Sequence, residues 1–264
     1  MDIDIVIPTY KPGSYLYDCL VSINSQDFFI DRYQVTIVLN GPKQPYFDQI
    51  SHWLSSFKFN SCLLYSEVAS VSSARNLALD KTSSNYVCFL DDDDLISENY
   101  LSNLIGLAKP GCIVVANTYN FVDDKNILTN DYLTFNETFV SNNLLKFRKY
   151  LSNSCCKLIP RALIKDRRFN NHLSKSEDAV FMFELSKDIS NIISTKPTTI
   201  YYRRLRENSA TRTKTKLIYE LGGAVKIIFY FSIVYIKKPL QYSFLLYCSR
   251  LLAVVKRVIL TLKG

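Results

Sequence analysis

The sequence predicts an α/β protein in which a mixed, mostly parallel sheet is flanked by helices. Over the first hundred residues, short apolar segments alternate with amphipathic ones, and the links between them are short. The segment 86–90 is apolar throughout, which is typical of a strand covered on both faces. Four consecutive aspartates, 91–94, follow it directly, at the position where open α/β sheets bind their ligands.

The elements of this first half follow from local patterns. Residues 14–27 carry apolar side chains at helical spacing. The turn signal Asn40-Gly41-Pro42 ends a strand, and Ser72 or Ser73 can cap a helix. We therefore expect four strands and three intervening helices, with the strands at 3–9, 33–39, 62–65 and 86–90 and the helices at 14–27, 46–57 and 72–81.

The second half is less regular. Its periodicity predicts helices at 97–108 and 176–188, and strands at 112–116 and 199–202. The stretch 121–158 has weaker periodicity and many Asn, Lys and aromatic residues. We interpret it as an insertion with a strand or two and a helix near 142–150.

Composition and charge indicate a globular body with a basic tail. Of the 264 residues, 48% are hydrophobic and 21% charged, which excludes a disordered chain. From residue 200 onward there are 13 Lys/Arg and two Asp/Glu, a net charge of +11, although the whole chain carries only +8. The positive charge of the tail therefore predicts an anionic partner, either a membrane or a nucleic acid. Seven cysteines without a CxxC pair favour a reducing compartment, and the N-terminus lacks a signal-peptide pattern.

The acid run 91–94 has two explanations. A solvated acidic turn that ends a strand is the simpler one. However, four adjacent carboxylates repel one another, and folding alone does not require them there. A hard divalent cation such as Mg²⁺ or Mn²⁺ would relieve the repulsion, because these ions prefer carboxylate oxygen.

Three further stretches suggest chemistry, and each has a structural alternative. Small residues followed by Arg75 at the start of a helix can form a phosphate site, although such an Arg is often only a surface residue. Glu177 and Asp178 open a helix, where acids also simply complement the helix dipole. The stretch 201–212 is a strand that runs into a basic loop, which is either a solvated loop or a lid whose arginines hold a diphosphate.

In order and spacing these stretches resemble the family-2 glycosyltransferases, which are inverting enzymes with a GT-A (Rossmann-like) fold. The matching features cover residues 1–212 and are Pro8-Thr9-Tyr10, the s-x-ARN segment 72–76, the FLDxDD motif at 89–94, the EDxxF motif at 177–181 and the basic segment 202–209. Two positions depart from the family pattern. Asn40 stands where the family usually has an Asp that contacts the base, and Val68-Ala69-Ser70 replaces its Asn-x-Gly.

The resemblance implies a role for each matching residue. Asp178 would be the catalytic base, with Glu177 beside it. Asp93 and Asp91 would hold Mg²⁺ or Mn²⁺, with Asp94 as a helper. The nucleotide sugar would be bound by the remaining positions, namely Pro8, Thr9, Tyr10, Asn40, Arg75, Asp91, Asp92, Arg203 and Arg206. Within this group Arg203 and Arg206 would close over the diphosphate.

The resemblance further implies a metal-dependent inverting glycosyltransferase that moves a sugar, with UDP as the expected nucleotide, to a glycan acceptor in bacterial surface polysaccharide synthesis. If the tail binds a membrane, a lipid-linked saccharide is the expected form of this acceptor. The catalytic domain would span 1–212, with a nucleotide-binding half at 1–116 and an acceptor-binding half at 117–212. Two other functions stay open, a metal-dependent nucleotidyltransferase and a non-enzymatic membrane-binding or nucleic-acid-binding protein.

The tail 213–264 lies outside the resemblance. It holds two apolar segments, 221–236 and 242–262, in which basic residues recur. The first segment is shorter than the roughly 20 residues that a membrane span needs. Amphipathic helices bound to anionic lipid at the cytoplasmic face of the inner membrane fit this pattern better than a nucleic-acid partner does. The alternative is that the helices simply pack on the catalytic domain.

Overall fold

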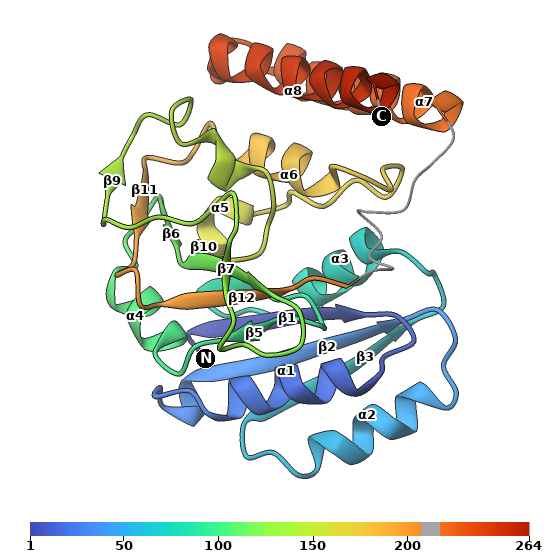
Figure 1. Ribbon diagram of the computed structural model, residues 1–264, viewed down its shortest axis with the longest axis vertical. Helices are drawn as coiled ribbons and strands as arrows, with labels where there is room; N and C mark the ends of the chain where they lie inside the picture. Colours follow the sequence, from blue (N-terminus) through green and yellow to red (C-terminus); the bar gives the residue numbers. More distant parts are fainter. Residues whose placement is uncertain (207–216, 264) are drawn as a thin grey trace.

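The computed structural model describes residues 1–206 and 217–263, and its centre is an eight-stranded sheet (Figure 1). The strands of this sheet run in the order β3 (Asn60–Ser66), β2 (Tyr33–Asn40), β1 (Ile3–Thr9), β4 (Tyr86–Phe89), β10 (Lys157–Pro160), β6 (Cys112–Val115), β11 (Asn191–Ser194) and β9 (Val140–Ser141). The first four are parallel, whereas β10 is antiparallel to both of its neighbours. The predicted mixed, mostly parallel sheet is thus confirmed.

Helices cover both faces of the parallel half. α1 (Ser14–Asn24) and α2 (Tyr46–Leu54) lie on one face, and α3 (Val71–Lys81) packs on the other against β1 and β2 (Figure 1). Because both faces are covered, all seven residues of β1 are buried. The carboxyl ends of β1, β2 and β4 consequently meet at one edge of the sheet, beside the start of α3.

A second, four-stranded sheet brings a distant segment to that edge. Its order is β5 (Leu95–Ile96), β12 (Ile200–Arg204), β7 (Asn117–Phe121) and β8 (Thr129–Asn130). β5 begins directly after the acid run and pairs with β12. The arginine-bearing end of β12 is therefore held next to residues 91–94.

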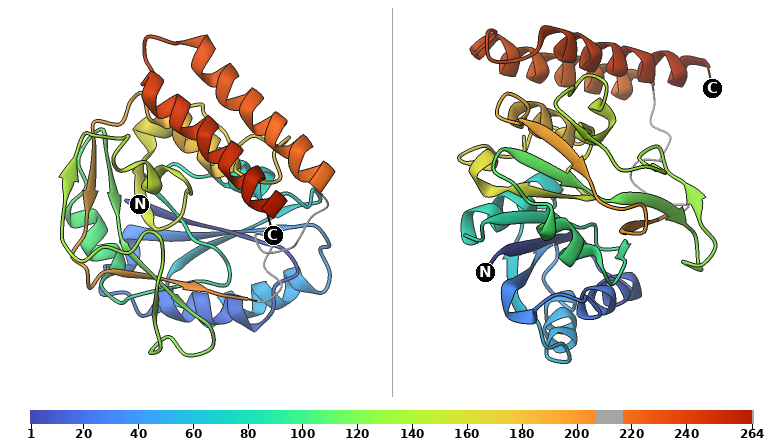
Figure 2. Two further views of the ribbon diagram at one scale, coloured as in Figure 1. Left: turned by 45° about the horizontal axis from the view of Figure 1, so that its top comes forward. Right: turned by 90° about the vertical axis from the view of Figure 1, so that its left-hand side faces the viewer.

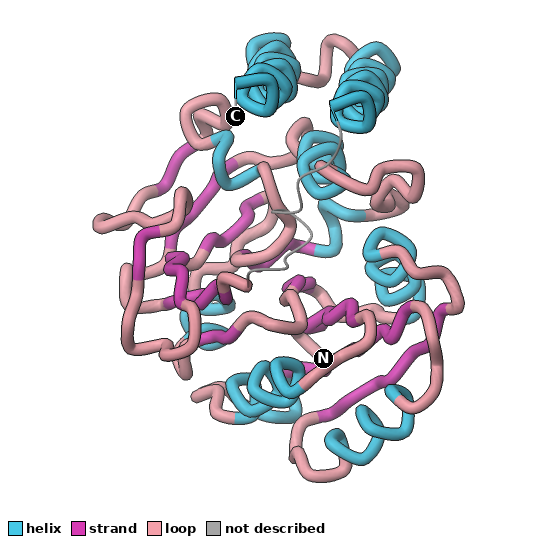
Figure 3. The backbone as a smooth tube through the Cα atoms, turned by 45° about the vertical axis from the view of Figure 1, so that its right-hand side comes forward, coloured by secondary structure: helices cyan, strands magenta, loops and turns pink. Residues whose placement is uncertain are grey.

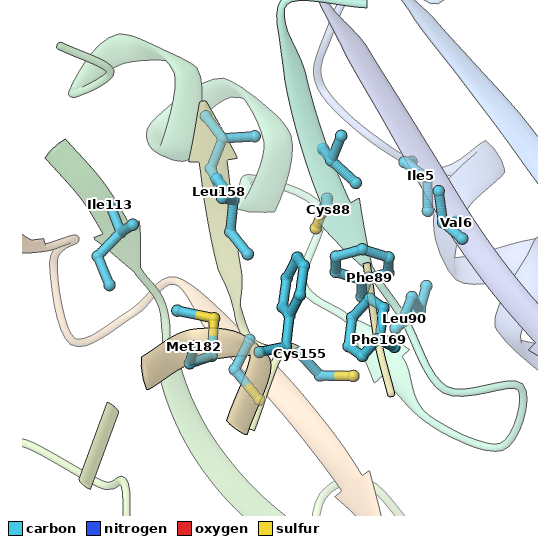
Figure 4. Close-up of a cluster of buried hydrophobic side chains, with 14 of the residues drawn as sticks. Ile5, Val6, Cys88, Phe89, Leu90, Ile113, Cys155, Leu158, Phe169 and Met182 are labelled. Atoms are coloured by element: carbon cyan, nitrogen blue, oxygen red, sulfur yellow. The ribbon is translucent and has the colours of Figure 1, made fainter. Parts of the chain in front are cut away.

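Three short helices complete the body, namely α4 (Tyr100–Gly106), α5 (Arg161–Ile164) and α6 (Glu177–Leu185). Beneath the acid run, Phe89 packs against Phe169 with Cys155 and Met182 nearby (Figure 4). The ring of Phe169 also stacks on that of Phe181, with 4.0 Å between the ring centroids. The guanidinium of Arg75 lies over the rings of Phe89 and Phe169 in this cluster.

The expected tail helices are present and form a hairpin, α7 (Leu217–Lys237) and α8 (Phe244–Lys263), at one end of the molecule (Figures 2 and 3). The hairpin packs on α6, where Phe231 meets Phe183 edge-on at 5.4 Å and the Tyr242 hydroxyl donates to the Glu184 carbonyl. α7 has 21 residues, so the expectation that this segment is too short to span a membrane is wrong. By length and composition alone, Tyr219–Lys237 is the one described helix that could do so.

The insertion differs most from the prediction. Instead of a helix near 142–150 there is only a 3-10 turn, η2 (Arg148–Leu151), much like η1 (Ile30–Arg32) earlier in the chain. The backbone N–H groups of Asn143 and Lys146 donate to Ser141 Oγ and Asn143 Oδ1, so side chains hold this segment as turns.

Two helix starts also differ from the prediction. α3 is capped by Ser70, whose hydroxyl accepts from the Ser73 amide, rather than by Ser72 or Ser73. α4 starts at Tyr100 and not at 97, because the Ser97 amide and hydroxyl bond to Ile200 of β12.

Candidate active site

The carboxyl ends of β1 and β4 are tied together by side chains of the predicted site. The Thr9 hydroxyl donates to Asp92 Oδ2 at 2.5 Å, and the Asn40 amide donates to the Thr9 carbonyl at 2.8 Å. Burial raises the pKa of Asp92 to about 6, while the Thr9 hydroxyl lowers it. Asp92 and Asn40 thus fix the strand ends around the edge.

Arg75 joins the two acidic motifs, which lie far apart in the chain. Its Nη1 donates to Asp178 Oδ1 at 2.9 Å, and its Nη2 donates to Asp91 Oδ1 at 3.1 Å. The guanidinium is 3% exposed and lies over the ring of Phe169, 5.3 Å from the centroid. Burial by itself lowers the pKa of Arg75, but Asp178 and the other anionic neighbours outweigh it, so the pKa rises.

The acid pair at the start of α6 faces this arginine. Asp178 accepts a second hydrogen bond on the same oxygen, from the Ser154 hydroxyl at 2.8 Å. Glu177 lies 3.5 Å from Arg75 Nη1, and burial followed by repulsion from Asp178 raises its pKa to about 7. The two neighbouring acids therefore occupy different electrostatic environments.

The second half of the acid run is bound by β12 and the residues after it. Asp93 pairs with Arg206 Nε at 2.5 Å, and its carbonyl accepts from Arg204 Nε. Asp94 is buried, and its carboxylate accepts from the backbone amide of Arg204 at 2.8 Å. Burial and repulsion from Asp91 raise the pKa of both Asp93 and Asp94. Asp94 thus binds the backbone of β12, whereas Asp93 pairs with the long side chain of Arg206.

The remaining predicted residues lie on the walls of the site. Pro8 is buried in β1, and the half-exposed ring of Tyr10 lies directly against Gly41, where an added Cβ would be 2.5 Å from Cε2. Arg203 is turned away from the acid run and pairs with Asp131 at 2.5 Å. The rest of the predicted basic loop, 207–212, lies outside the described residues.

The residues present suit a divalent cation that also binds phosphate. Among residues 1–206 and 217–263, no three His, Cys, Asp or Glu side chains come together as a complete metal cage. The Asp91 side chain is 44% exposed, and Asp91 and Asp93 repel each other although each also pairs with an arginine, Arg75 and Arg206 respectively. Two oxygen donors therefore lie close together at the edge of the sheet. Mg²⁺ is commonly bound in this way, by one or two carboxylates plus substrate phosphates.

Sequence reasoning missed residues that surround Asp178. Besides Ser154, the fully buried Lys157 donates to the carbonyls of Asn153 and Cys155 and to the Asn153 side chain. Burial lowers the pKa of Lys157 to about 8. No periodicity or motif in the sequence marks this loop, because its role depends on non-local contacts.

The site is defined by its charges rather than by an obvious cavity. A cavity of about 620 Å³ lies between α1 and residues 95–99, and none of the acids named above lines it. The acidic cluster is instead an open edge between the two sheets. Carboxylates therefore lie at the carboxyl ends of parallel strands, joined to a buried arginine, which is the edge where open α/β sheets commonly bind their ligands.

Comparison with known proteins identifies the family. The model of glycosyl transferase family 2 matches residues 4–168, so the chain belongs to that family. It is 25% identical over 227 residues to the minor teichoic acid biosynthesis protein GgaB of Bacillus subtilis, a match that covers 81% of this chain but only 24% of GgaB. The chain thus spans about a quarter of that relative's length.

Solved structures share the fold. The TarS 1–349 structure from Staphylococcus aureus in complex with UDP-GlcNAc aligns with a TM-score of 0.74 at 19% identity, over 88% of this chain and 66% of that one. The mannosyltransferase PcManGT from Pyrobaculum calidifontis, in complex with GDP-Man and Mn²⁺, aligns with a TM-score of 0.65 at 15% identity, over 99% of this chain and 74% of that one. The GT-A fold expected from the sequence is confirmed.

Proposed function

We propose that this chain is a metal-dependent, inverting glycosyltransferase that moves a sugar from a nucleotide sugar to a hydroxyl of a glycan acceptor. The observation that carries the proposal is Arg75, which binds both Asp91 at the end of β4 and Asp178 at the start of α6. One buried side chain thereby unites a donor-side acid with a candidate base. Family membership favours sugar transfer over nucleotidyl transfer.

The donor would be bound at the ends of β1, β2 and β4. Thr9 and Asn40 lie at the ends of β1 and β2, and the exposed ring of Tyr10 offers a face for the nucleotide's base. The residues that would hold Mg²⁺ or Mn²⁺ are Asp91 and Asp93, and the cation, when bound, would offset charge on the diphosphate. PcManGT, a relative in fold, was solved with Mn²⁺, and TarS with UDP-GlcNAc.

In the proposed reaction, Asp178 accepts the proton of the acceptor hydroxyl while that oxygen forms a bond to the anomeric carbon. The bond between this carbon and the diphosphate oxygen breaks, and its electron pair leaves with the diphosphate. A single displacement inverts the anomeric configuration. Arg206, which now pairs with Asp93, is placed to bind the diphosphate instead. Arg203 reaches the diphosphate only if it leaves Asp131.

We assign residues 1–116 to donor binding and 117–212 to acceptor binding. Most of the donor groups described above come from the first segment, but Arg203 and Arg206, which are proposed for the diphosphate, come from the second. Ser154, Glu177 and Asp178 also come from the second segment. A lipid-linked saccharide at the cytoplasmic face of the inner membrane is the proposed acceptor. GgaB is named for teichoic acid biosynthesis, which supports a surface polymer as the product class.

The hairpin is the proposed membrane contact. Large apolar side chains of α7, α8 and their connection stay exposed, among them Val225, Phe229, Ile236, Leu240, Phe244 and Leu252. Exposed Lys237 and Lys238 lie beside them, which suits an anionic lipid surface. Phe229→Glu should abolish sedimentation with phosphatidylglycerol vesicles, and binding equal to the wild type would refute this contact.

The proposal is tested by UDP or GDP release from a panel of nucleotide sugars that includes UDP-GlcNAc and GDP-mannose, with and without Mn²⁺. We expect turnover that needs the cation and falls about 100- to 1,000-fold in Asp93→Ala. Asp178→Asn should bind the donor normally but lose transfer. Full transfer by Asp178→Asn would disprove the base assignment, and turnover that ignores chelation would disprove metal dependence.

A further inference from the structure

The inner side of α8 carries two arginines that reach into the catalytic body. Arg250 is 5% exposed, and burial together with Arg148 lowers its pKa to about 10. Its Nη1 donates to Ser152 Oγ at 3.0 Å and its Nη2 to the Arg148 carbonyl at 2.9 Å. α8 is thereby joined to the loop that leads from η2 towards Ser154.

The second arginine reaches the start of α6. Arg257 Nη1 donates to Ser176 Oγ at 3.0 Å, and Ser176 immediately precedes the acid pair. Ser176 is left-handed, with φ of 63°, and its hydroxyl makes no cap bond to its own helix. Next to it, Lys175 pairs with Glu220 of α7, which also lies 4.0 Å from Arg257 Nε. Both tail helices therefore bind the two residues before Glu177.

These two attachments converge on one carboxylate. The loop held by Arg250 at Ser152 continues to Ser154, whose hydroxyl bonds Asp178 Oδ1. The segment held by Arg257 at Ser176 continues within two residues to Asp178 itself. Asp178 is consequently positioned from both sides by segments that α8 anchors.

Simple packing does not explain these arginines. The hairpin already packs on α6 through apolar contacts such as Phe231 against Phe183. The Arg257 side chain is 35% exposed, and its Nε lies 4.0 Å from Glu220. Arg250, in contrast, is 5% exposed, and burying its guanidinium costs free energy because its Nε has no hydrogen-bond partner in the described structure. Such a costly contact is expected where exact placement of a functional group matters.

We propose that Arg250 and Arg257 are positioning residues for Asp178, so that the C-terminal hairpin is part of the catalytic unit and not only a membrane contact. This inference rests on the proposed role of Asp178 as the base. Displacing a catalytic group by about 1 Å can lower a rate about 100-fold. A hairpin that holds the base from two sides therefore affects turnover without touching the donor.

The first test compares Arg250→Gln and Arg257→Gln with Arg32→Gln, which removes an exposed arginine that pairs with Asp2. The rate is UDP release from UDP-GlcNAc with Mn²⁺, and the affinity for UDP with Mn²⁺ is measured by calorimetry. We expect kcat to fall about 10- to 100-fold in both tail variants, with UDP affinity unchanged. Arg32→Gln should change neither, and Arg257→Lys, which keeps a donor for Ser176, should recover most of the rate.

Hydrogen exchange gives a readout that does not depend on the donor sugar. Exchange in residues 150–157 should rise in Arg250→Gln, exchange in 174–180 should rise in Arg257→Gln, and neither should rise in Arg32→Gln. If Arg250→Gln does not fold, Ser152→Ala removes the same bond from the other side. Unchanged exchange in these segments would overturn the proposal.

A double-mutant cycle identifies the route of the effect. If Arg250 acts through Ser154, the losses in Arg250→Gln and Ser154→Ala are not additive, whereas additive losses would refute that route. Parallel loss of kcat and UDP affinity would indicate a general folding defect and overturn the inference. Asp178→Asn is assayed in the same experiment. Full turnover by Asp178→Asn would refute the proposed base. If Asp178→Asn is inactive but the arginine variants turn over normally, only the positioning role is refuted.

Discussion

Replacing Glu177 by glutamine tests the electrostatics of the site directly. The Glu177 side chain is 12% exposed, and burial followed by repulsion from Asp178 raises its pKa from 4.5 to about 7, against the opposing effect of Arg75. Because the pKa in the folded protein lies above that in the unfolded chain, the group favours folding most below pH 4.5. That contribution disappears as the pH rises through 7.

The size of the effect follows from the two pKa values. Between pH 5 and pH 8, titration of Glu177 should lower the free energy of unfolding of the wild type by about 2 to 3 kcal/mol. Glu177→Gln has no titrating group at this position. Between pH 5 and pH 8 its free energy of unfolding should therefore fall by about 2 to 3 kcal/mol less than that of the wild type. Other acids with raised pKa, such as Asp92, contribute equally to both proteins and cancel in the comparison.

The assay is urea denaturation followed by far-UV circular dichroism at pH 5, 6, 7 and 8, with a chelator present. Glu98→Gln, at an exposed position, is the matched control and should follow the wild type. If Glu177→Gln and the wild type lost equal stability between pH 5 and pH 8, the raised pKa of Glu177 would be refuted.

Two further substitutions probe the centre and the floor of the site. Arg75→Lys keeps the charge but cannot bridge Asp91 and Asp178 at once, so one charge-assisted hydrogen bond is lost. Urea denaturation should therefore show a decrease of about 1.5 to 3 kcal/mol in the free energy of unfolding. An unchanged denaturation midpoint would contradict the bridge. Phe169→Ala removes the ring that stacks on Phe181 beneath Arg75 and should cost about 3 to 5 kcal/mol in the same assay, whereas a loss below about 1 kcal/mol would mean that the cluster repacks.

Local patterns predicted the parallel half of the fold well. β1 has the predicted bounds Ile3–Thr9, and β2 and β4 differ from the prediction by one residue at one end. These strands are buried on both faces, so their sequences are continuous apolar runs with clear turn signals. The short strand β11 was missed although it is apolar. β7 was missed because it carries Asn117 and Asn120, and asparagine is depleted in strands.

In the site, too, residues that belong to a local sequence pattern could be predicted, whereas residues that act through distant contacts could not. The sequence indicated Arg75, the acid run and the acid pair because each is a compact group of chemically unusual residues. It could not indicate Ser154 or Arg250, because an isolated Ser or Arg has no local signature. Their contribution depends on contacts between residues 24 and 98 positions apart, to Asp178 and Ser152 respectively. Arg203 has the predicted basic character, but its contact with Asp131 depends on the pairing of the second sheet.

The arrangement around Arg75 also distinguishes between the explanations that were open for Asp178. An acid in the first turn of a helix can be explained by the helix dipole alone. Asp178, however, accepts from Arg75 and Ser154, which lie 103 and 24 residues away in the chain. A buried arginine surrounded by carboxylates contributes little net stability, since apolar residues of similar volume would serve folding as well or better. The network is therefore better explained by the proposed role of Asp178 as the base than by the stability of the fold.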